Sequence, residues 1–378
     1  MSAEDFTPAE RARGRALRRA QSPWALGGRL AGLGLSLLLG FTPAGAGLVT
    51  AAGGLFGGGR TAEVLAGTAA LVLLGEAVRL PFSARIRVLR HGYGLVTQGW
   101  GGWVADALRS LALTLALALP VVLGLYALTD RSPDGWWLPA AAGAAVLTVA
   151  LSFLYPLVVE PVFNRFTPMP AGPLRSALLA LAERDGVAVR DVLVADASRR
   201  TTALNAYVSG LGATRRIVAY DTLLSTAEPR EVELVVAHEL GHVRNRDVAT
   251  GTALGAVGAA GAVGLLGLLT GWGPLLSAAG AQSMADPRSL PLLAACAALT
   301  GALAGPPQCA VSRRVEARAD RHALELTGDA EQFIAMQRRL AVANVSDVDP
   351  PRVLELLFAT HPSAVRRIAA ARAWRPAT

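Results

Sequence analysis

Six long apolar stretches constrain what this chain can fold into more than any other feature of its sequence. They occupy residues 30–49, 64–78, 111–128, 138–159, 248–270 and 290–304. A helix needs about 20 mostly apolar residues to cross the hydrocarbon core of a bilayer, and these stretches reach or approach that length. We therefore predict a mainly α-helical, polytopic membrane protein with about six transmembrane helices.

Composition and charge favour a membrane protein over a soluble or nucleic-acid-binding one. The chain is 52% hydrophobic and only 17% charged, with a mean hydropathy of +0.41. Its positive charge comes from arginine alone, because the sequence contains no lysine. Of its 36 arginines, 33 lie in residues 1–29, 79–109, 165–246 and 313–375. This asymmetry follows the positive-inside rule and predicts that these segments face the cytoplasm of a plasma-membrane protein.

The polar and apolar segments suggest a division of the chain into four parts. Residues 1–159 form an amino-terminal membrane region with four spans and a cytoplasmic loop near 80–107, and residues 248–305 hold two further spans. Residues 160–247 and 306–378 lie on the same membrane face, where they can meet as two halves of one domain. The first half combines helical periodicity with the β-branched runs RDVLVADAS and RRIVAYDTLL, which predicts an α+β domain.

The sequence VVAHELGHVRNRD places His238, Glu239 and His242 on one short predicted helix. Residues four apart share a helix face, so both imidazoles can bind one cation while Glu239 reaches a water beside it. This spacing predicts one catalytic zinc ion per chain, with Glu239 as the general base that activates water for peptide-bond hydrolysis. The alternative interpretation is a pair of surface histidines on a solvated helix.

A catalytic zinc site needs a third protein ligand and an open position for water. Glu316 in SRRVEARADRH is a candidate, because Asp320 lies about one helical turn later on the same face and can orient a ligand. The same two acids could instead form an exposed face paired with nearby arginines, namely Arg313, Arg314 and Arg318. Spacing alone does not choose between these interpretations.

Several sequence blocks resemble the type I CAAX prenyl proteases, a family of integral-membrane zinc metallopeptidases of the gluzincin kind. The blocks are EPVFNRFTPMPAG, NAYVSGLGATRRIVAYDTLL, HELGHVRNRD, SRRVEARAD and THPSAVRRI, and they extend from about residue 155 to 370. The resemblance implies a cytoplasmic gluzincin-like metallopeptidase domain. The stretch VRNRD after the second histidine is closer to the bacterial HtpX-like proteases, so the chain is similar to a bacterial homologue of the family.

The resemblance also implies a role for each candidate site residue. The implied metal ligands are His238, His242 and Glu316, and Asp320 would orient one of them. The residues implied to contact the substrate or the transition state are Asn205, Arg367 and His361. Asn205 would lie on the strand that holds the substrate backbone. His361 is expected to be catalytic without binding the metal, and the alternative for it is a loop-packing histidine.

Three functions are compatible with these features. The first is a CAAX prenyl protease-like endopeptidase that acts on peptide or membrane-protein substrates, including lipidated ones. The second is an HtpX-like membrane protein quality-control protease. The third is a non-catalytic membrane receptor or scaffold, which is disfavoured because zinc binding alone would not require Glu239 and because the outer loops are too short for a sensor domain. The lipid bilayer is a partner in each case, and nucleic acid is not expected.

Overall fold

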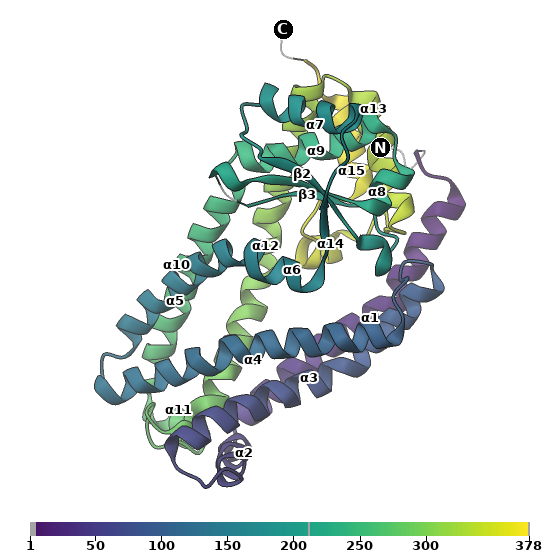
Figure 1. Ribbon diagram of the computed structural model, residues 1–378. Coiled ribbons are helices and arrows are strands. Elements are labelled where there is room, and N and C mark those ends of the chain that lie inside the picture. Colours follow the sequence, from purple (N-terminus) through teal and green to yellow (C-terminus); the bar gives the residue numbers. More distant parts are fainter. Residues whose placement is uncertain (1–4, 211, 377–378) are drawn as a thin grey trace.

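Long helices form one part of the molecule, and a smaller mixed α/β part lies at one end of them (Figure 1). The computed structural model describes residues 5–210 and 212–376. Five segments in this described part are long and apolar enough to cross a membrane: α3 (Arg60–Gly92), α4 (Trp100–Arg131), α5 with its continuation (Trp137–Phe163), α10 (Asp247–Thr270) and a segment containing α12 (Pro287–Thr327). A bent pair, α1 (Pro8–Gly40) and α2 (Pro43–Gly54), makes a sixth if it is counted as one span. The predicted number of about six spans is confirmed.

The first predicted span, residues 30–49, is not one straight helix, and this corrects the interpretation of that stretch. α1 ends at Gly40 and α2 begins at Pro43, with an angle of 82° between the two helices. Thr42 has the extended backbone angles φ −135° and ψ 159°. The ring of a following proline disfavours helical backbone at the preceding residue, which explains why the helix breaks here.

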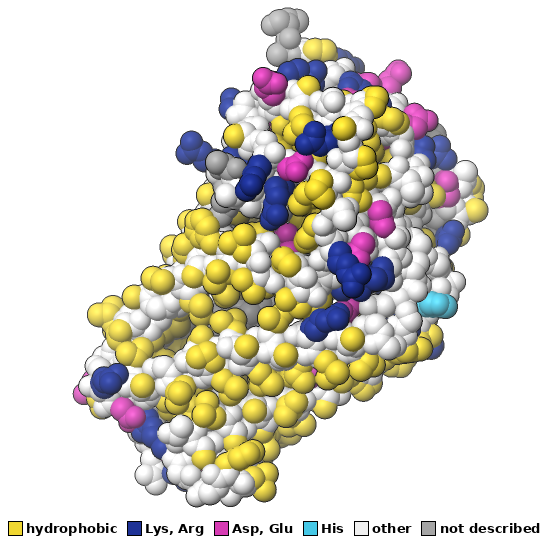
Figure 2. All heavy atoms as spheres, viewed as in Figure 1, with side chains coloured by type: hydrophobic (Ala, Val, Ile, Leu, Met, Phe, Trp, Pro, Cys, Tyr) yellow, Lys and Arg dark blue, Asp and Glu magenta, His cyan; other side chains and the backbone are white. Residues whose placement is uncertain are grey.

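Apolar side chains cover the outside of the long helices. Figure 2 shows them spread over α4, α5 and α10, whereas charged side chains gather mainly on the α/β part. Leu138, Val146, Val257 and Leu268 are between 63% and 77% exposed, as expected of side chains that face lipid tails. In the same view, the surface is hollowed between α4 and the packed pair α5 and α10. These features are those of a multi-pass membrane protein.

The predicted cytoplasmic loop near 80–107 is mostly helical. α3 continues to Gly92 and α4 begins at Trp100, because the arginines and leucines of this segment are good helix formers. Only residues 93–99 connect the two helices. Within this connection, Val96 forms an isolated β-bridge with Thr201, whose hydroxyl donates to the Leu95 carbonyl at 2.9 Å. The connection therefore joins the membrane helices to the α/β part.

A four-stranded sheet lies in the α/β part, with the strand order β1-β2-β4-β3. β2 (Asp191–Ala195) and β4 (Arg216–Tyr220) pair in parallel and correspond to the two β-branched runs, so both predicted strands are confirmed. β1 (Phe166–Pro168) pairs antiparallel with β2, and β3 (Ala206–Ser209) pairs antiparallel with β4. β3 is consequently an edge strand.

One apolar core holds helices against this sheet. Its fully buried members include Leu178, Ile217, Leu234 and Phe333, which come from α7, β4, α9 and α13. The remaining helices of the described chain are α6 (Glu160–Phe163), α7 (Pro173–Arg184), α8 (Asp221–Thr226), α9 (Pro229–Arg244), α11 (Gly273–Ala278), α13 (Ala330–Ala343), α14 (Arg352–Phe358) and α15 (Ala364–Ala373). A π-helical turn (Tyr155–Val159) joins α5 (Trp137–Leu154) to α6, and single 3-10 turns occur at Ala197–Arg199, Gly212–Thr214 and Pro287–Ser289.

The last membrane helix continues into the α/β part without a break. α12 (Leu290–Thr327) is one helix of 38 residues, so the proposed boundary at residue 305 falls inside it. It ends at Thr327, before Gly328, whose φ of +67° is a left-handed conformation that glycine adopts at little cost. Glu316 and Asp320 are therefore carried on the extension of a membrane helix.

Candidate metal centre

α9 presents His238, Glu239 and His242 toward one point. The helix begins at Pro229 after a Glu228 capping box, and its apolar face is buried in the core. The two imidazoles four residues apart stack edge to face, with ring centroids 4.9 Å apart. Ligand-type atoms of all three residues lie within 4.8 Å of one another. The helix geometry expected from the H-E-x-x-H spacing is therefore present.

Glu316 reaches the same point from α12. Its Oε2 lies 3.2 Å from His238 Nε2, and its Oε1 lies 3.6 Å from His242 Nε2. Gly241 lets the two helices approach closely, because a Cβ at this position would lie only 3.2 Å from the backbone of Ala319 on α12. Glu316 is 7% exposed, so the alternative of an exposed acidic face is wrong for this residue.

A carboxylate contacts the Nδ1 atom of each histidine. Asp320 Oδ1 lies 2.9 Å from His238 Nδ1, and Asp247 Oδ2 lies 3.0 Å from His242 Nδ1. These contacts leave both Nε2 atoms directed at Glu316. Carboxylates in such positions fix the ring orientation and tautomer of metal-binding histidines. Asp320 is 5% exposed and is not paired with the neighbouring arginines of its own helix; its partner is Arg367, described below.

Asp247 was not identified from the sequence. It is the last residue of VRNRD and the first residue of α10, and Arg246 before it has a left-handed φ of 56°. That turn brings Asp247 back to His242, and Arg318 on α12 forms an ion pair with its other oxygen. An acid five residues after the second histidine was the only sequence signal for this contact.

The carboxyl-terminal segment brings Arg367 and His361 to the same cluster. Arg367 on α15 donates from Nε to Asp320 Oδ2 at 2.7 Å, and one of its terminal nitrogens lies 3.5 Å from His238 Nδ1. His361 lies between α14 and α15, with Nε2 3.2 Å from Glu316 Oε2. Its imidazole side chain is 56% exposed, so it borders the cluster from the solvent side.

Asn205 lies one residue before β3, not within it. Its carbonyl accepts a hydrogen bond from the Tyr220 N–H at 3.0 Å, which begins the pairing of β3 with β4. Its side chain is exposed, and the α9 helix packs against β3. The structure thus brings seven of the eight predicted site residues into one cluster and places Asn205 at the start of the neighbouring edge strand.

The charges in the cluster fit a bound cation. Burial raises the pKa of Glu239 above that of an ordinary carboxyl. For His238, burial opposes the charged form, but hydrogen bonds with Asp320 and Glu316 raise its pKa to about 9. These carboxylates favour a positive charge on the imidazole, and a metal ion bound at Nε2 would supply that charge in place of a proton.

The donor set also fits zinc in its spacing. Tetrahedral ligands about 2.0 Å from zinc are separated from one another by about 3.3 Å, close to the 3.2 and 3.6 Å between Glu316 and the two imidazoles. Glu316 Oε2 is buried, and although the Nε2 atoms of His238 and His361 lie 3.2 Å from it, neither contact is a well-aligned hydrogen bond. An acidic oxygen buried in this way is costly unless a cation or donor satisfies it.

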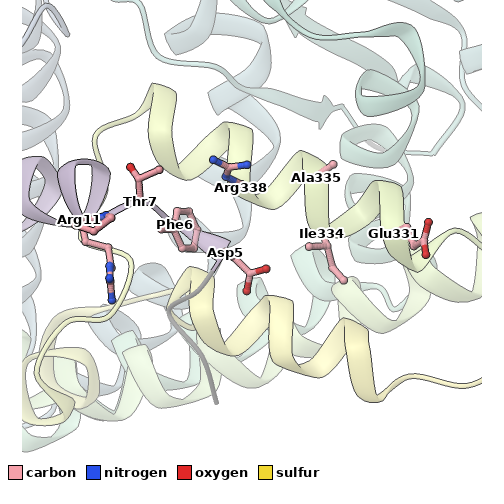
Figure 3. Close-up of a pocket in the computed structure, with 9 residues that line it drawn as sticks. Asp5, Phe6, Thr7, Arg11, Glu331, Ile334, Ala335 and Arg338 are labelled. Carbon is pink, nitrogen blue, oxygen red and sulfur yellow. The ribbon is translucent and has the colours of Figure 1, made fainter.

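A separate cleft of about 630 Å³ lies away from these residues (Figure 3). It is formed by the chain around Phe6 and Arg11 on one side and by Ile334 and Arg338 of α13 on the other. None of its lining residues belongs to the cluster around Glu316. This cleft is therefore not the place where a substrate would meet the candidate metal ligands.

Family models match nearly the whole chain. Residues 168–375 match the model described as Peptidase family M48. Residues 6–165 match the model described as CAAX prenyl protease N-terminal, five membrane helices.

Two curated relatives and one solved structure extend this result. An uncharacterized metalloprotease, YhfN of Bacillus subtilis, is 32% identical over 305 residues, covering 79% of this chain and 70% of that protein. CAAX prenyl protease 1 of Saccharomyces cerevisiae is 32% identical over 171 residues, which are 45% of this chain and only 38% of the yeast protein. The crystal structure of S. mikatae Ste24p superposes with a TM-score of 0.87 at 21% identity, covering 98% of this chain and 90% of that one, and so shows the same fold.

Proposed function

The chain belongs to peptidase family M48 and is a multi-pass membrane metallopeptidase, and from this premise we propose that it is a zinc endopeptidase with a cytoplasmic active site. The observation that carries the proposal is the convergence of Glu316 from α12 on the Nε2 atoms of His238 and His242 from α9. Two imidazoles and one carboxylate are a ligand set used by catalytic zinc sites, which keep a fourth position open.

In this proposal each residue of the cluster has one task. His238, His242 and Glu316 hold one zinc ion per chain, while Asp320 and Asp247 fix the two imidazoles. Zinc supplies Lewis acidity to the peptide carbonyl and to the attacking water. Glu239 is not needed as a ligand and is therefore available to transfer protons.

Proton transfer falls to Glu239. Because burial raises its pKa, the carboxylate is a stronger base than an exposed one. It accepts a proton from the water that attacks the peptide carbonyl and then delivers that proton to the leaving amine. His361 contacts Glu316 and Arg367 contacts Asp320. In this proposal their N–H groups stabilise the oxyanion that develops on the carbonyl oxygen. Asn205 and β3 hold the substrate backbone.

An apolar surface beside the site favours lipidated substrates. α14 ends three residues before His361, and Val353, Leu356 and Phe358 on it are between 45% and 64% exposed. In Figure 1, α14 lies where the α/β part meets the long helices. We propose that the substrate is the carboxyl-terminal peptide of a membrane-associated protein that carries a prenyl group, as the name of the yeast relative indicates for that enzyme.

Cleavage of a farnesylated peptide ending in a CAAX sequence tests this function. We expect the purified protein in detergent to cleave it, a zinc chelator to abolish cleavage, and added zinc to restore it. Removing the farnesyl group should lower kcat/KM by about tenfold or more, because burial of an apolar group contributes about 0.8 kcal/mol per methylene. Cleavage that resists chelation would contradict the zinc assignment. Equal cleavage of unlipidated, unfolded β-casein would favour the quality-control alternative.

The proposed orientation is tested by thiol labelling in intact cells. In a background with Cys296→Ala and Cys309→Ala, a cysteine at exposed Ala188 should be protected from an impermeant reagent, and one at exposed Asp134 should react. The expectation follows from the 33 arginines on the proposed cytoplasmic side. Permeabilised cells provide the control, because both cysteines should then react. Labelling of Ala188→Cys in sealed cells would reverse the topology.

His361→Ala should lower kcat by about 100- to 1,000-fold while zinc content is unchanged, the loss expected when one oxyanion donor is removed. In this proposal the imidazole, which is 56% exposed and lies 3.2 Å from Glu316 Oε2, acts on the substrate and does not bind the metal. His91→Ala is the matched control, since His91 is exposed at the end of α3. Near-normal kcat in His361→Ala, or loss of zinc, would remove His361 from the mechanism.

A further inference from the structure

The side chain of Asn344 clamps the backbone of Leu204. Asn344 directly follows α13. Its Oδ1 accepts a hydrogen bond from the Leu204 N–H at 3.0 Å, and its Nδ2 lies 3.4 Å from the Leu204 carbonyl oxygen in the donor direction. The two residues are 140 positions apart in sequence. A carboxamide therefore pairs with the main chain here much as a neighbouring strand would.

The clamp acts at the entrance to the edge strand. Leu204 precedes Asn205, whose carbonyl accepts from Tyr220 and opens the ladder between β3 and β4. The Thr222 hydroxyl donates to the Ala203 carbonyl at 2.7 Å, so the backbone is held on both sides of the clamp. Because β3 is an edge strand, its position sets where an extended substrate backbone can lie.

The loop that bears Asn344 is itself fixed to other elements. Asp347 forms an ion pair with Arg18 of α1, and a Cβ at Gly14 of α1 would overlap the Ser346 carbonyl oxygen. Val345 has a left-handed φ of 48°, which is unusual for a β-branched residue. Strained backbone of this kind persists only where surrounding contacts determine it. The loop is thus a rigid point to which Leu204 is attached.

The same loop also contacts the helix that carries Arg367. The Val365 N–H donates to the Val348 carbonyl at 3.3 Å, and both side chains lie in a small core with Ile368 and Phe6. One end of the loop therefore bonds to the first turn of α15, and the other end holds Leu204. Residues 344–348 thus connect the helix that carries Arg367 to the segment that enters the edge strand.

We propose that Asn344 is a positioning residue that sets the register of edge strand β3 against the metal centre, an inference that rests on the proposed endopeptidase function. It acts through Leu204 and touches neither metal ligand nor substrate. An edge strand holds the peptide in the ground state and the transition state alike. Loss of its register should therefore raise KM while leaving kcat and metal content unchanged.

Asn344→Asp is the sharpest test, because it keeps the shape of the side chain and removes its only donor. The new carboxylate would face the Leu204 carbonyl, an acceptor against an acceptor. We expect KM for the farnesylated peptide, or for β-casein if only that is cleaved, to rise about tenfold with kcat within about twofold. Amide hydrogen exchange at residues 204–209 should become faster in the zinc-loaded full-length protein, while exchange in α9 stays as in the wild type.

Arg338→Gln is the matched control. It breaks an exposed ion pair of α13 with Glu10 but leaves loop 344–348 and the Leu204 clamp intact. It should leave KM unchanged. If Asn344→Asp cannot hold zinc, Asn344→Gln replaces it, since that variant keeps donor and acceptor on a longer arm and should raise KM less.

The outcomes separate the two proposals. A wild type that cleaves neither substrate overturns the endopeptidase function and this inference with it. A wild type that cleaves, together with an Asn344→Asp variant of unchanged KM and full zinc content, overturns the inference alone. Loss of zinc in both Asn344 variants would also overturn it, because Asn344 would then support folding and not substrate register.

Discussion

Glu239→Gln should lower kcat for peptide hydrolysis by about 1,000- to 10,000-fold while the protein still binds one zinc ion per chain. Glutamine occupies the same space on α9 but cannot accept a proton from water at neutral pH. The buried surroundings that raise the pKa of Glu239 make the carboxylate a better base, and an amide cannot use them. KM should change little, because the proton moves only during the chemical step.

Zinc content by elemental analysis and kcat with the farnesylated peptide are the two measurements. Glu233→Gln on the same helix is the matched control, since Glu233 pairs with Arg230 at 2.7 Å and has no role in the proposed mechanism. It should retain activity. His238, Glu239 and His242 form a compact group of potential ligands by themselves. A Glu239→Gln protein that loses its zinc would therefore mean that Glu239 binds the metal.

The parts of the site that could be predicted from sequence depend on local geometry. The H-E-x-x-H spacing fixes His238 and His242 on one helix face whatever the rest of the chain does. Both predicted β-branched runs form strands, because backbone preferences act over a few residues. The family resemblance supplied Arg367, His361 and Asn205, and the structure brings the first two into the cluster around Glu316.

The parts that could not be predicted depend on contacts between distant segments. Sequence spacing did not decide whether Glu316 is a metal ligand or part of an exposed face, because burial of its helix face depends on the close approach of α12 to α9 at Gly241. Asp247 was missed because a left-handed residue, Arg246, turns the chain back toward His242. Nothing in the sequence indicated the role of Asn344, since an asparagine after a helix is normally explained by its preference for helix ends.

The membrane part shows the same limit. Hydropathy located the spans because lipid requires apolar side chains along a whole helix. It did not reveal the break before Pro43 or the continuation of α12 into the α/β part, because an apolar run carries no information on bends. Pro306 and Pro307 lie inside α12, where a proline would ordinarily suggest a helix end.

Glu316→Ala should abolish zinc binding, lowering affinity by more than the 10- to 100-fold typical of losing a supporting contact around a metal site. The variant removes the carboxylate whose oxygens lie 3.2 and 3.6 Å from the two Nε2 atoms, and water must then replace a buried charged ligand. His361 would also lose its partner at 3.2 Å. Activity should disappear together with the metal, in contrast to Glu239→Gln, where it disappears while the metal stays.

Thermal unfolding with and without zinc gives a readout of Glu316→Ala that does not depend on activity. Zinc should raise the unfolding temperature of the wild type, because a ligand that binds only the folded state stabilises it, and should not raise that of the variant. Glu325→Ala is the control, since Glu325 is exposed on the same helix nine residues further along. It should bind zinc like the wild type. Full zinc affinity in Glu316→Ala would refute the assignment of the third ligand, and Asp320 and His361 would then be the next candidates to test.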